Sequence, residues 1–314
     1  MKNFASHNRL VASFCMRAIM VVMISMSALN ISAQQEWNYS QYLFNLYDIN
    51  SAYAGNHNTM SFALRHRSQW IGLEGSPSTQ QFSLHTPMMN GKLGVGLKMN
   101  MDQIGARTQQ SGRLSVAYRL KLASGTLSMG VAGGVIRQSI DRNKLHSADE
   151  QDVVLQGLNS PAITPVADFS VFYSTKKFYA GVDCGRINRS PFGFSENSIA
   201  RLYYNASLVA GYMKRVGDDN MIQLSGLYKY SEGKLWQAEL NLLYLYRNKA
   251  WFGAGYRLQC CFQVFACANI SEHFRLGLSY DLADGEMRSS NDGSAEIFLG
   301  YTLKNRSGKS VRYF

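Results

Sequence analysis

The feature that most constrains the fold is an alternation of apolar with small or polar residues, repeated along most of the chain in segments of about ten residues. In residues 92–101 ("KLGVGLKMNM"), leucine, valine and methionine take the odd positions, and glycine, lysine and asparagine take the even ones. Residues 113–122 ("RLSVAYRLKL") follow the same pattern. Because successive side chains of a β-strand point to opposite faces, each segment is predicted to be a strand with one apolar face.

Every second connection between these segments is short, and all the long connections fall among the others. About fourteen segments can be counted, at 60–66, 78–86, 92–102, 110–122, 125–137, 166–173, 178–186, 200–213, 220–230, 235–247, 250–258, 260–270, 273–282 and 293–303. The short connections are 87–91, 123–125, 174–177, 214–219, 248–249 and 271–273, and the long ones are 67–77, 138–165, 187–199 and 283–292. Short turns at one end and long loops at the other are typical of an outer-membrane barrel.

Strands that cross a membrane must belong to a closed sheet. Lipid offers no hydrogen bonds, so strands can cross it only when every backbone group is paired within the sheet. Segments of ~10 residues match the length of a tilted transmembrane strand. We therefore predict an all-β fold, a transmembrane antiparallel β-barrel of about fourteen strands. The alternative is a soluble secreted β-sandwich, in which the apolar faces would line the space between two sheets.

The N-terminus resembles a secretory signal. Residues 1–33 contain Lys2, Arg9 and Arg17, an apolar run at 18–29, and "ISA" before residue 34. An uncleaved membrane anchor is the alternative, but the run is shorter than the ~20 residues that a spanning helix needs. We expect a cleaved signal peptide at 1–33 and localisation in the outer membrane of a Gram-negative cell. The other predicted parts are a periplasmic or plug segment at 34–56, the barrel at 57–304 and a periplasmic tail at 305–314.

Charge and cysteine content point away from nucleic acid and from structural zinc. The formal net charge of +11 is spread along the chain rather than gathered on one motif, so no nucleic-acid partner is predicted. For an exported basic protein we expect acidic lipid headgroups, glycans or a protein as partners. The four cysteines beyond the leader form no C-x-x-C pair, and a single disulfide among them is left open. They are Cys184, Cys260, Cys261 and Cys267.

No catalytic, cofactor-binding or metal-binding residues are predicted. None of the histidines beyond the leader lies near a serine or cysteine in a nucleophile motif. The glycines in "GVG" (94–96) and "GVAGG" (130–134) lie within alternating strands, where they would ease curvature or make room on the inner face. The acidic "DEQD" at 149–152 lacks the spacing of a calcium loop and is taken as solvated. We expect a non-enzymatic protein.

A dense set of motifs follows the leader. Residues 41–88 begin "QYLFNLYDINSAYAG" and continue through "RSQWIG", "GSPSTQ" and "HTP". This stretch resembles the N-terminal signature of the PorP/SprF family of outer-membrane proteins, which serve type IX secretion and gliding motility. Two positions, Leu46 and Ser51, stand where the family pattern usually has proline. The signature residues that we take as candidates for partner docking are Gln41, Tyr42, Phe44, Asn45, Asn50, Ala52, Tyr53, Ala54, Gly55, Arg67, Gln69, Trp70, Gly72, Pro77, Thr79 and Gln80.

The resemblance implies a role in protein secretion. It implies that the barrel helps to secrete or anchor an adhesin-like partner at the cell surface, chiefly through the loops at 138–165 and 187–199. It also implies contacts with periplasmic ring components or a peptidoglycan-binding lipoprotein, and with outer-membrane lipid. The segment at 41–55 would plug the lumen or dock a periplasmic partner.

The rival function is a passive channel or uptake porin. The predicted inner face carries both signs of charge, which could line an aqueous pore or interlock and close the lumen. These residues are Lys98, Arg113, Arg119, Lys121, Arg137 and Arg275, with Asp183, Glu239, Asp281 and Glu296.

Overall fold

The computed structural model divides the chain into two units, Met1–Gln34 and Gln35–Phe314. It describes residues 39–57, 59–145, 160–191, 201–232 and 235–303, all of which belong to the second unit. The predicted leader at 1–33, the tail at 305–314 and the acidic run at 149–152 lie outside these residues.

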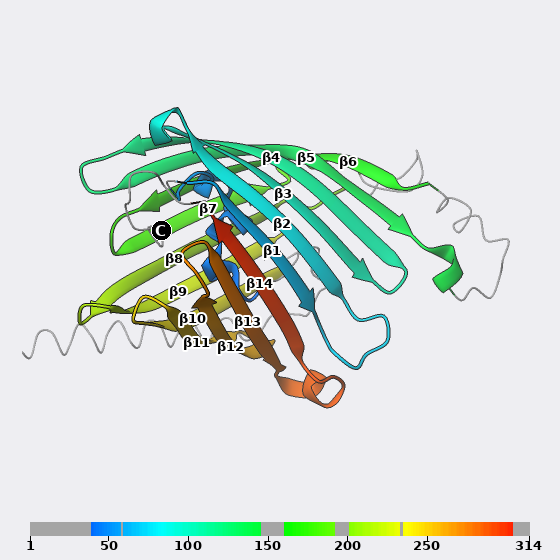
Figure 1. Cartoon of the computed structure of the whole chain (residues 1–314). Helices are drawn as coiled ribbons and strands as arrows, with labels where there is room; N and C mark the ends of the chain where they lie inside the picture. Colours follow the sequence, from blue (N-terminus) through cyan, green and yellow to red (C-terminus); the bar gives the residue numbers. More distant parts are fainter. Residues whose placement is uncertain (1–38, 58, 146–159, 192–200, 233–234, 304–314) are drawn as a thin grey trace, which may run out of the picture. The chain divides into compact units, whose positions relative to one another are not determined.

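Fourteen antiparallel strands form a closed barrel (Figure 1). Each strand pairs with its neighbours in the chain, and pairing of β1 with β14 closes the sheet. The strands are β1 Ser61–Ser68, β2 Ser78–Met88, β3 Leu93–Ile104, β4 Arg107–Lys121, β5 Thr126–Ile140, β6 Ala162–Ser174, β7 Phe178–Gly185, β8 Asn205–Val216, β9 Asn220–Ser231, β10 Leu235–Tyr246, β11 Ala250–Arg257, β12 Cys261–Asn269, β13 Phe274–Ala283 and β14 Ser294–Thr302. The predicted fold class and strand number are therefore confirmed.

The two ends of the barrel differ as the sequence predicts. At one end, which we call the short-turn end, all six connections have three or four residues. The other, long-loop end carries the connections at 69–77, 141–161, 186–204 and 284–293. Two short helices also lie at the long-loop end, η6 (Arg142–Lys144) and η7 (Gly285–Ser289), whereas η5 (Met89–Gly91) lies at the short-turn end.

The alternation in sequence becomes an apolar outer wall and a mostly polar inner wall. On β3, for example, Lys98 and Asn100 are buried and point inward, whereas Met99 and Met101 are exposed. On β4, Arg113 and Ser115 are buried, whereas Leu114 is 68% exposed. A barrel with this outer surface can face hydrocarbon along its whole circumference.

Two side chains differ from their predicted direction. Arg137 points outward, because its neighbour Ile136 is buried inside against Val166 and Leu202. The alternation of apolar with polar residues would place the apolar Trp251 on the outer wall, but it is 3% exposed and points inward. Both exceptions place an apolar side chain in the lumen, which shows that the interior is not uniformly polar.

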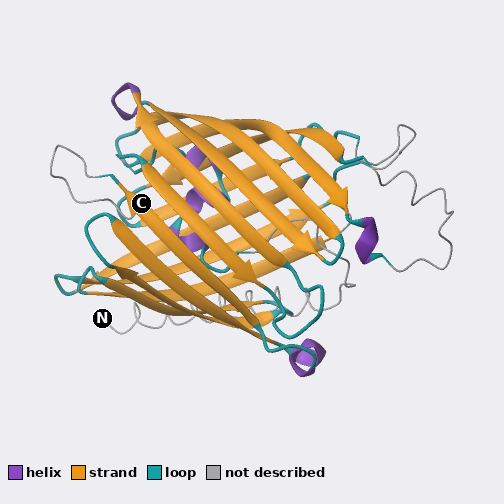
Figure 2. Ribbon diagram, turned by 45° about the vertical axis from the view of Figure 1, so that its right-hand side comes forward, coloured by secondary structure: helices purple, strands orange, loops and turns teal. Residues whose placement is uncertain are grey.

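The lumen holds a segment of the chain itself. Three single-turn 3₁₀ helices lie inside the barrel, η2 (Tyr42–Phe44), η3 (Leu46–Asp48) and η4 (Ser51–Tyr53), and they are visible between its walls in Figure 2. Among the described residues, no helix is long and apolar enough to cross a membrane.

Candidate functional site

The candidate site is the N-terminal segment at residues 39–57, which we call the plug. Its large side chains are removed from solvent almost completely, since Tyr42 and Tyr47 are both 0% exposed and Leu46 is 1% exposed. These aromatics need other parts of the chain, or a partner protein, to bury them, because 3₁₀ turns this short have no core of their own. The barrel wall therefore supplies the core that the segment lacks.

The plug runs lengthwise through the lumen. The hydroxyl of Tyr39 donates to Asn100 at 3.0 Å, and that of Ser40 donates to Asp281 at 2.7 Å, near the long-loop ends of β3 and β13. At the other end of the plug, His57 Nδ1 lies 2.9 Å from the hydroxyl of Ser61, the first residue of β1. The segment thus passes from the long-loop half of the lumen to the short-turn end.

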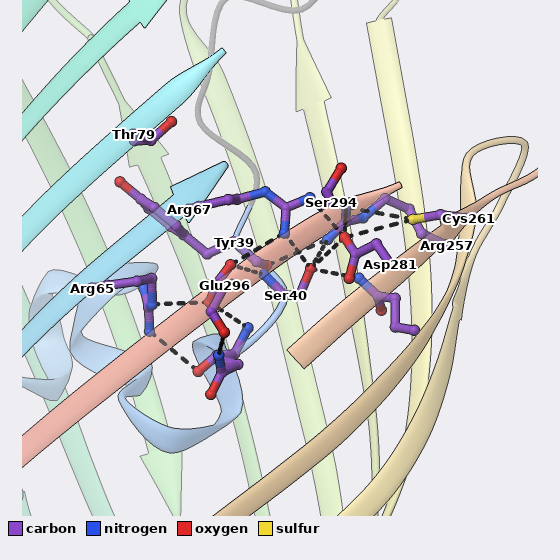
Figure 3. A network of polar contacts seen from close by, with 12 residues as sticks. Tyr39, Ser40, Arg65, Arg67, Thr79, Arg257, Cys261, Asp281, Ser294 and Glu296 are labelled. Carbon is purple, nitrogen blue, oxygen red and sulfur yellow. Dashed lines mark hydrogen bonds and ion pairs between the residues drawn. The ribbon is translucent and has the colours of Figure 1, made fainter. Parts of the chain in front are cut away.

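Buried ion pairs hold the part of the plug that lies in the long-loop half of the lumen (Figure 3). The guanidinium of Arg67 lies 2.6 Å from Asp281 and 3.3 Å from Glu296, and it donates to Ser40 of the plug at 2.9 Å. Glu296 in turn accepts from the backbone N–H groups of Ser40 and Gln41 at 2.9 and 3.0 Å. Each carboxylate oxygen of Glu296 is therefore shared between the wall and the plug.

Two further arginines extend this arrangement. Arg65 lies 2.7 Å from Asp48 of the plug and 3.1 Å from Glu296. Arg257 lies 2.8 Å from Glu239 and donates weakly to the backbone carbonyl of Tyr39 at 3.4 Å. We call the set the ion-pair network; it comprises Asp48, Arg65, Arg67, Glu239, Arg257, Asp281 and Glu296.

The network is costly to interrupt. None of its side chains is more than 2% exposed. Removing one partner of a buried pair leaves a desolvated charge and commonly costs ~3–5 kcal/mol, although the intact pair need not stabilise the fold by that amount. The network therefore favours one position of residues 39–41 in the lumen, because any other position would leave buried charges without partners.

The part of the plug that lies towards the short-turn end is held by aromatic packing. The ring of Tyr53 meets Phe172 edge to face at 5.2 Å, and the ring of Tyr47 lies 5.1 Å from that of His85. The rings of Tyr47, Tyr53 and Phe172 belong to a buried cluster that joins plug and wall. Its wall members are Ala63, Ala117, Phe172, Tyr179, Val209, Leu227, Leu243, Leu245, Trp251, Cys267 and Phe298.

Glycines on the inner wall make room for the plug. A Cβ atom at Gly130 would lie 2.7 Å from Cα of Ala52, and one at Gly94 or Gly96 would overlap Ala54 or the ring of Tyr47. Real Cβ atoms do not approach other atoms so closely, so these positions accept only glycine while the plug is seated. This confirms that "GVG" (94–96) makes room on the inner face.

Burial also changes the ionisation of plug residues. It lowers the pKa of His57 from 6.5 to about 3, with smaller contributions from Arg275 and Arg119. It raises the pKa of Tyr53 to about 12. For Asp48, burial raises the pKa, and the adjacent Arg65 opposes that shift.

The signature residues divide into four places. In the plug are Gln41, Tyr42, Phe44, Asn45, Asn50, Ala52, Tyr53, Ala54 and Gly55, all of them buried. On the inner wall are Arg67 and Thr79, and on the outer wall is Gln80. In the connection between β1 and β2 are Gln69, Trp70, Gly72 and Pro77. The structure thus brings the plug together with Arg67, and leaves the connection and Gln80 apart from it.

The β1–β2 connection, residues 69–77, forms a platform at the long-loop end. Its backbone is tied to the β13–β14 connection, where Ile71 donates to Gly293 and accepts from Asp292, each at 2.8 Å. It presents three partly exposed apolar side chains, Trp70, Ile71 and Leu73, at 37–38% exposure.

Sequence reasoning missed Arg257, counted Arg65 only as a scattered basic residue, and took Arg67 as a signature residue for partner docking rather than as part of an ion-pair network. A usable signal is that Arg65 and Arg67 occupy alternate positions of one strand, on the face opposite Leu64. A second signal is that Leu243 and Leu245 are apolar at inward positions, because apolar side chains are unfavourable in a water-filled lumen.

Within the described ranges, no group of three or more His, Cys, Asp or Glu residues could hold a metal ion. The cysteines Cys184, Cys260, Cys261 and Cys267 are free thiols in this structure.

Comparison with known proteins decides the family. The model for the type IX secretion system membrane protein PorP/SprF matches residues 31–301. The chain belongs to the PorP/SprF family. It is a membrane barrel of the type IX secretion system and not an enzyme. In such an outer-membrane barrel the long loops lie outside the cell, so the long-loop end is extracellular and the short-turn end periplasmic.

Solved structures with a similar fold include several outer-membrane proteins. The Acinetobacter baumannii outer membrane protein Omp33 shares 7% identity at a TM-score of 0.47, over 79% of this chain and 100% of that one. The Ralstonia pickettii toluene transporter TbuX shares 11% at 0.49, over 81% and 90%. A TodX mutant, a monoaromatic hydrocarbon channel, shares 10% at 0.48, over 85% and 94%. No curated protein matches the chain.

Proposed function

We propose that this PorP/SprF protein is a closed outer-membrane anchor that holds a secreted partner at the cell surface. The single observation that carries the proposal is the seated plug, which occupies the lumen and is fixed to the wall by the ion-pair network. A barrel filled by its own chain is suited to present surfaces at its two ends rather than to pass solutes.

The rival role as a passive channel fits this interior less well. Porins keep an aqueous lumen. Two of the acids that could line a pore are Asp281 and Glu296. Both are instead paired with Arg67 and hydrogen-bonded to Ser40. Below them, Leu243, Leu245 and Trp251 replace polar lining with apolar packing.

In our proposal, the extracellular partner meets the platform and the neighbouring long loops. Backbone hydrogen bonds hold the platform in one shape, so binding to it costs little ordering. Trp70, Ile71 and Leu73 supply an apolar contact of the kind that dominates protein interfaces. The loops at 138–165 and 187–199 would add the contacts that distinguish one secreted partner from another.

The periplasmic partners proposed for the family would meet the short turns. The plug aromatics are unsuited to this role while they are seated, because Tyr42, Tyr47 and Tyr53 are at most 2% exposed. We therefore assign the N-terminal signature to closure of the barrel, and the signature residues Gln69, Trp70, Gly72 and Pro77 to the surface platform.

Site-specific photo-crosslinking in the native cell tests the proposal. A crosslinker at Ile71 is expected to capture a protein exported by the same type IX system, and Trp70→Ala is expected to reduce the amount of that protein retained at the surface severalfold. Phe262→Ala, which removes an aromatic that is even more exposed than Trp70 from the lipid-facing wall, is the control. Crosslinks at Ile71 to lipid alone, with normal retention in Trp70→Ala, would contradict the role.

A further inference from the structure

The outer wall carries a groove of about 810 Å³ that the proposed function does not use. It lies between two parallel rows of outward side chains that cross β14, β1, β2, β3, β4 and β5 in register. The upper row, nearer the extracellular end, is Ile297, His66, Gln80, Met101, Gln110 and Arg137. The lower row is Leu299, Leu64, Phe82, Met99, Gly112 and Val135.

The two rows differ in chemistry. The lower row is wholly apolar. At Gly112 the missing side chain leaves free space in the groove, since a Cβ atom there would meet nothing within 4 Å. The upper row contains four of the few polar side chains on the outer wall, and it ends in a cation. Arg137 is exposed and donates to Gln110 at 3.1 Å. His66 and Gln80 lie opposite each other on β1 and β2.

The opposite wall shows that this pattern is local. The outward residues of β10 from Trp236 to Tyr246 are all apolar. The polar members of the upper row lie two or three residues from the extracellular ends of their strands, at the level where hydrocarbon gives way to headgroups.

We propose that this groove binds a phosphorylated lipid of the outer leaflet. An acyl chain would lie between the rows, whose five strand-to-strand steps of ~4.8 Å give a length of ~24 Å. The phosphate would pair with Arg137, as guanidinium groups favour phosphate oxygens. Gln110, which lies beside Arg137, would hydrogen-bond the polar linkage between chain and headgroup. The volume lies within the ~300–1,000 Å³ usual for small-molecule sites.

The complementarity favours lipid over a second protein. A lipid is apolar below and anionic above, in the same order as the two rows. Arg137 faces outward at the membrane surface, where the anionic headgroups of the leaflet lie. The groove also faces the membrane directly, so a lipid reaches it without displacing any part of the chain.

Native mass spectrometry of the full-length protein, with added lipid, tests the site. The probe is a diphosphorylated glucosamine-disaccharide lipid, compared with phosphatidylcholine of equal chain length. One tightly bound copy of the phosphorylated lipid is expected. Arg137→Gln should weaken its binding about tenfold or more, since a charge-assisted hydrogen bond is lost. Gly112→Leu should displace it by filling the groove.

Matched controls separate this site from general attraction to the membrane. Lys214→Gln removes an exposed cation from the other end of the outer wall, and Gly226→Leu adds bulk on the opposite wall. Neither should change binding by more than about twofold. Retained heat-modifiable mobility in gels checks that each variant is folded. Equal losses in Arg137→Gln and Lys214→Gln, unchanged binding in Gly112→Leu, or equal binding of phosphatidylcholine would overturn the proposal.

Discussion

Glu296 joins two arginines of the wall to the backbone of the plug. It joins Arg65, Arg67 and two backbone N–H groups of the plug, and its side chain is 0% exposed. Glu296→Gln keeps the shape but leaves the arginines short of a counter-charge. We expect it to destabilise the seated plug by ~3–5 kcal/mol. Hydrogen exchange of the amides of residues 39–57 measures the effect.

Glu232→Gln is the control for that substitution. Glu232 pairs with Arg189 at 2.6 Å, yet the two side chains are 34% and 51% exposed. Solvent screens such a pair, so its loss should cost no more than ~1 kcal/mol. Equal protection of residues 39–57 in the two variants would show that burial of the network does not hold the plug.

Gly96 tests the steric fit of the plug. Gly96→Val would drive a side chain into the ring of Tyr47, and we expect the plug to leave its seat while the barrel stays closed as a sheet. Gly133→Val, at an outward position with open space around it, is the control. Accessibility of a Leu46→Cys thiol to a charged reagent, in each background, reports the outcome, because Leu46 is 1% exposed in the seated plug and its replacement leaves Tyr47 in place. A protected thiol in Gly96→Val would mean that the wall yields instead.

His57 gives the plug a pH dependence of known sign. Its pKa is about 3 when seated and 6.5 when exposed, so both states are neutral above 6.5. Below 6.5 only the released plug takes up a proton, and seating should weaken by ~1.4 kcal/mol per pH unit down to about 3. The groups that face the ring are Tyr53 and His85, with Arg119 and Arg275 nearby.

His57→Gln isolates this effect, because other groups titrate as well. Burial raises the pKa of Asp48, so its protonation favours the seated plug as pH falls, in the opposite sense to His57. The difference between the wild type and His57→Gln removes that shared background. The measurement is proteolysis of the plug from pH 7 to pH 4. Parallel profiles for the two proteins would exclude His57 as the source of acid sensitivity.

At the scale of elements, the strands followed from sequence because lipid imposes a strict alternation on their outer faces. On β9 and β13 this alternation is nearly unbroken. It failed on β10 and β11, where Leu243, Leu245 and Trp251 point inward although apolar. Their burial depends on the plug, a contact between distant parts of the chain that no local pattern encodes.

The plug, too, was only partly predictable from the sequence. Its placement before the first strand and its need for burial were readable from its aromatics, and the glycines at 94–96 marked an inner wall that needed room. The partners of Ser40 could not be predicted, because Arg67, Asp281 and Glu296 come together only when β1 pairs with β14. The direction of Arg137 was missed for a similar reason, since Leu202, from a distant connection, covers Ile136.

At the scale of the whole molecule, the barrel has three surfaces that differ in chemistry. The lumen is occupied by the plug, with charged contacts in its extracellular half and apolar contacts below. The extracellular end carries the platform, where Trp70 is partly exposed. The outer wall carries the groove ending at Arg137. Because strand pairing does not involve the plug, the sheet should close without it.

The most direct test is the single-channel conductance of the purified protein in a planar bilayer, compared with that of a variant lacking residues 41–55. We predict that the wild type gives no steady open-pore current, and that the folded deletion variant conducts in discrete, stable steps. Steady currents from the wild type that match those of the deletion variant would contradict a lumen closed by its own N-terminal segment.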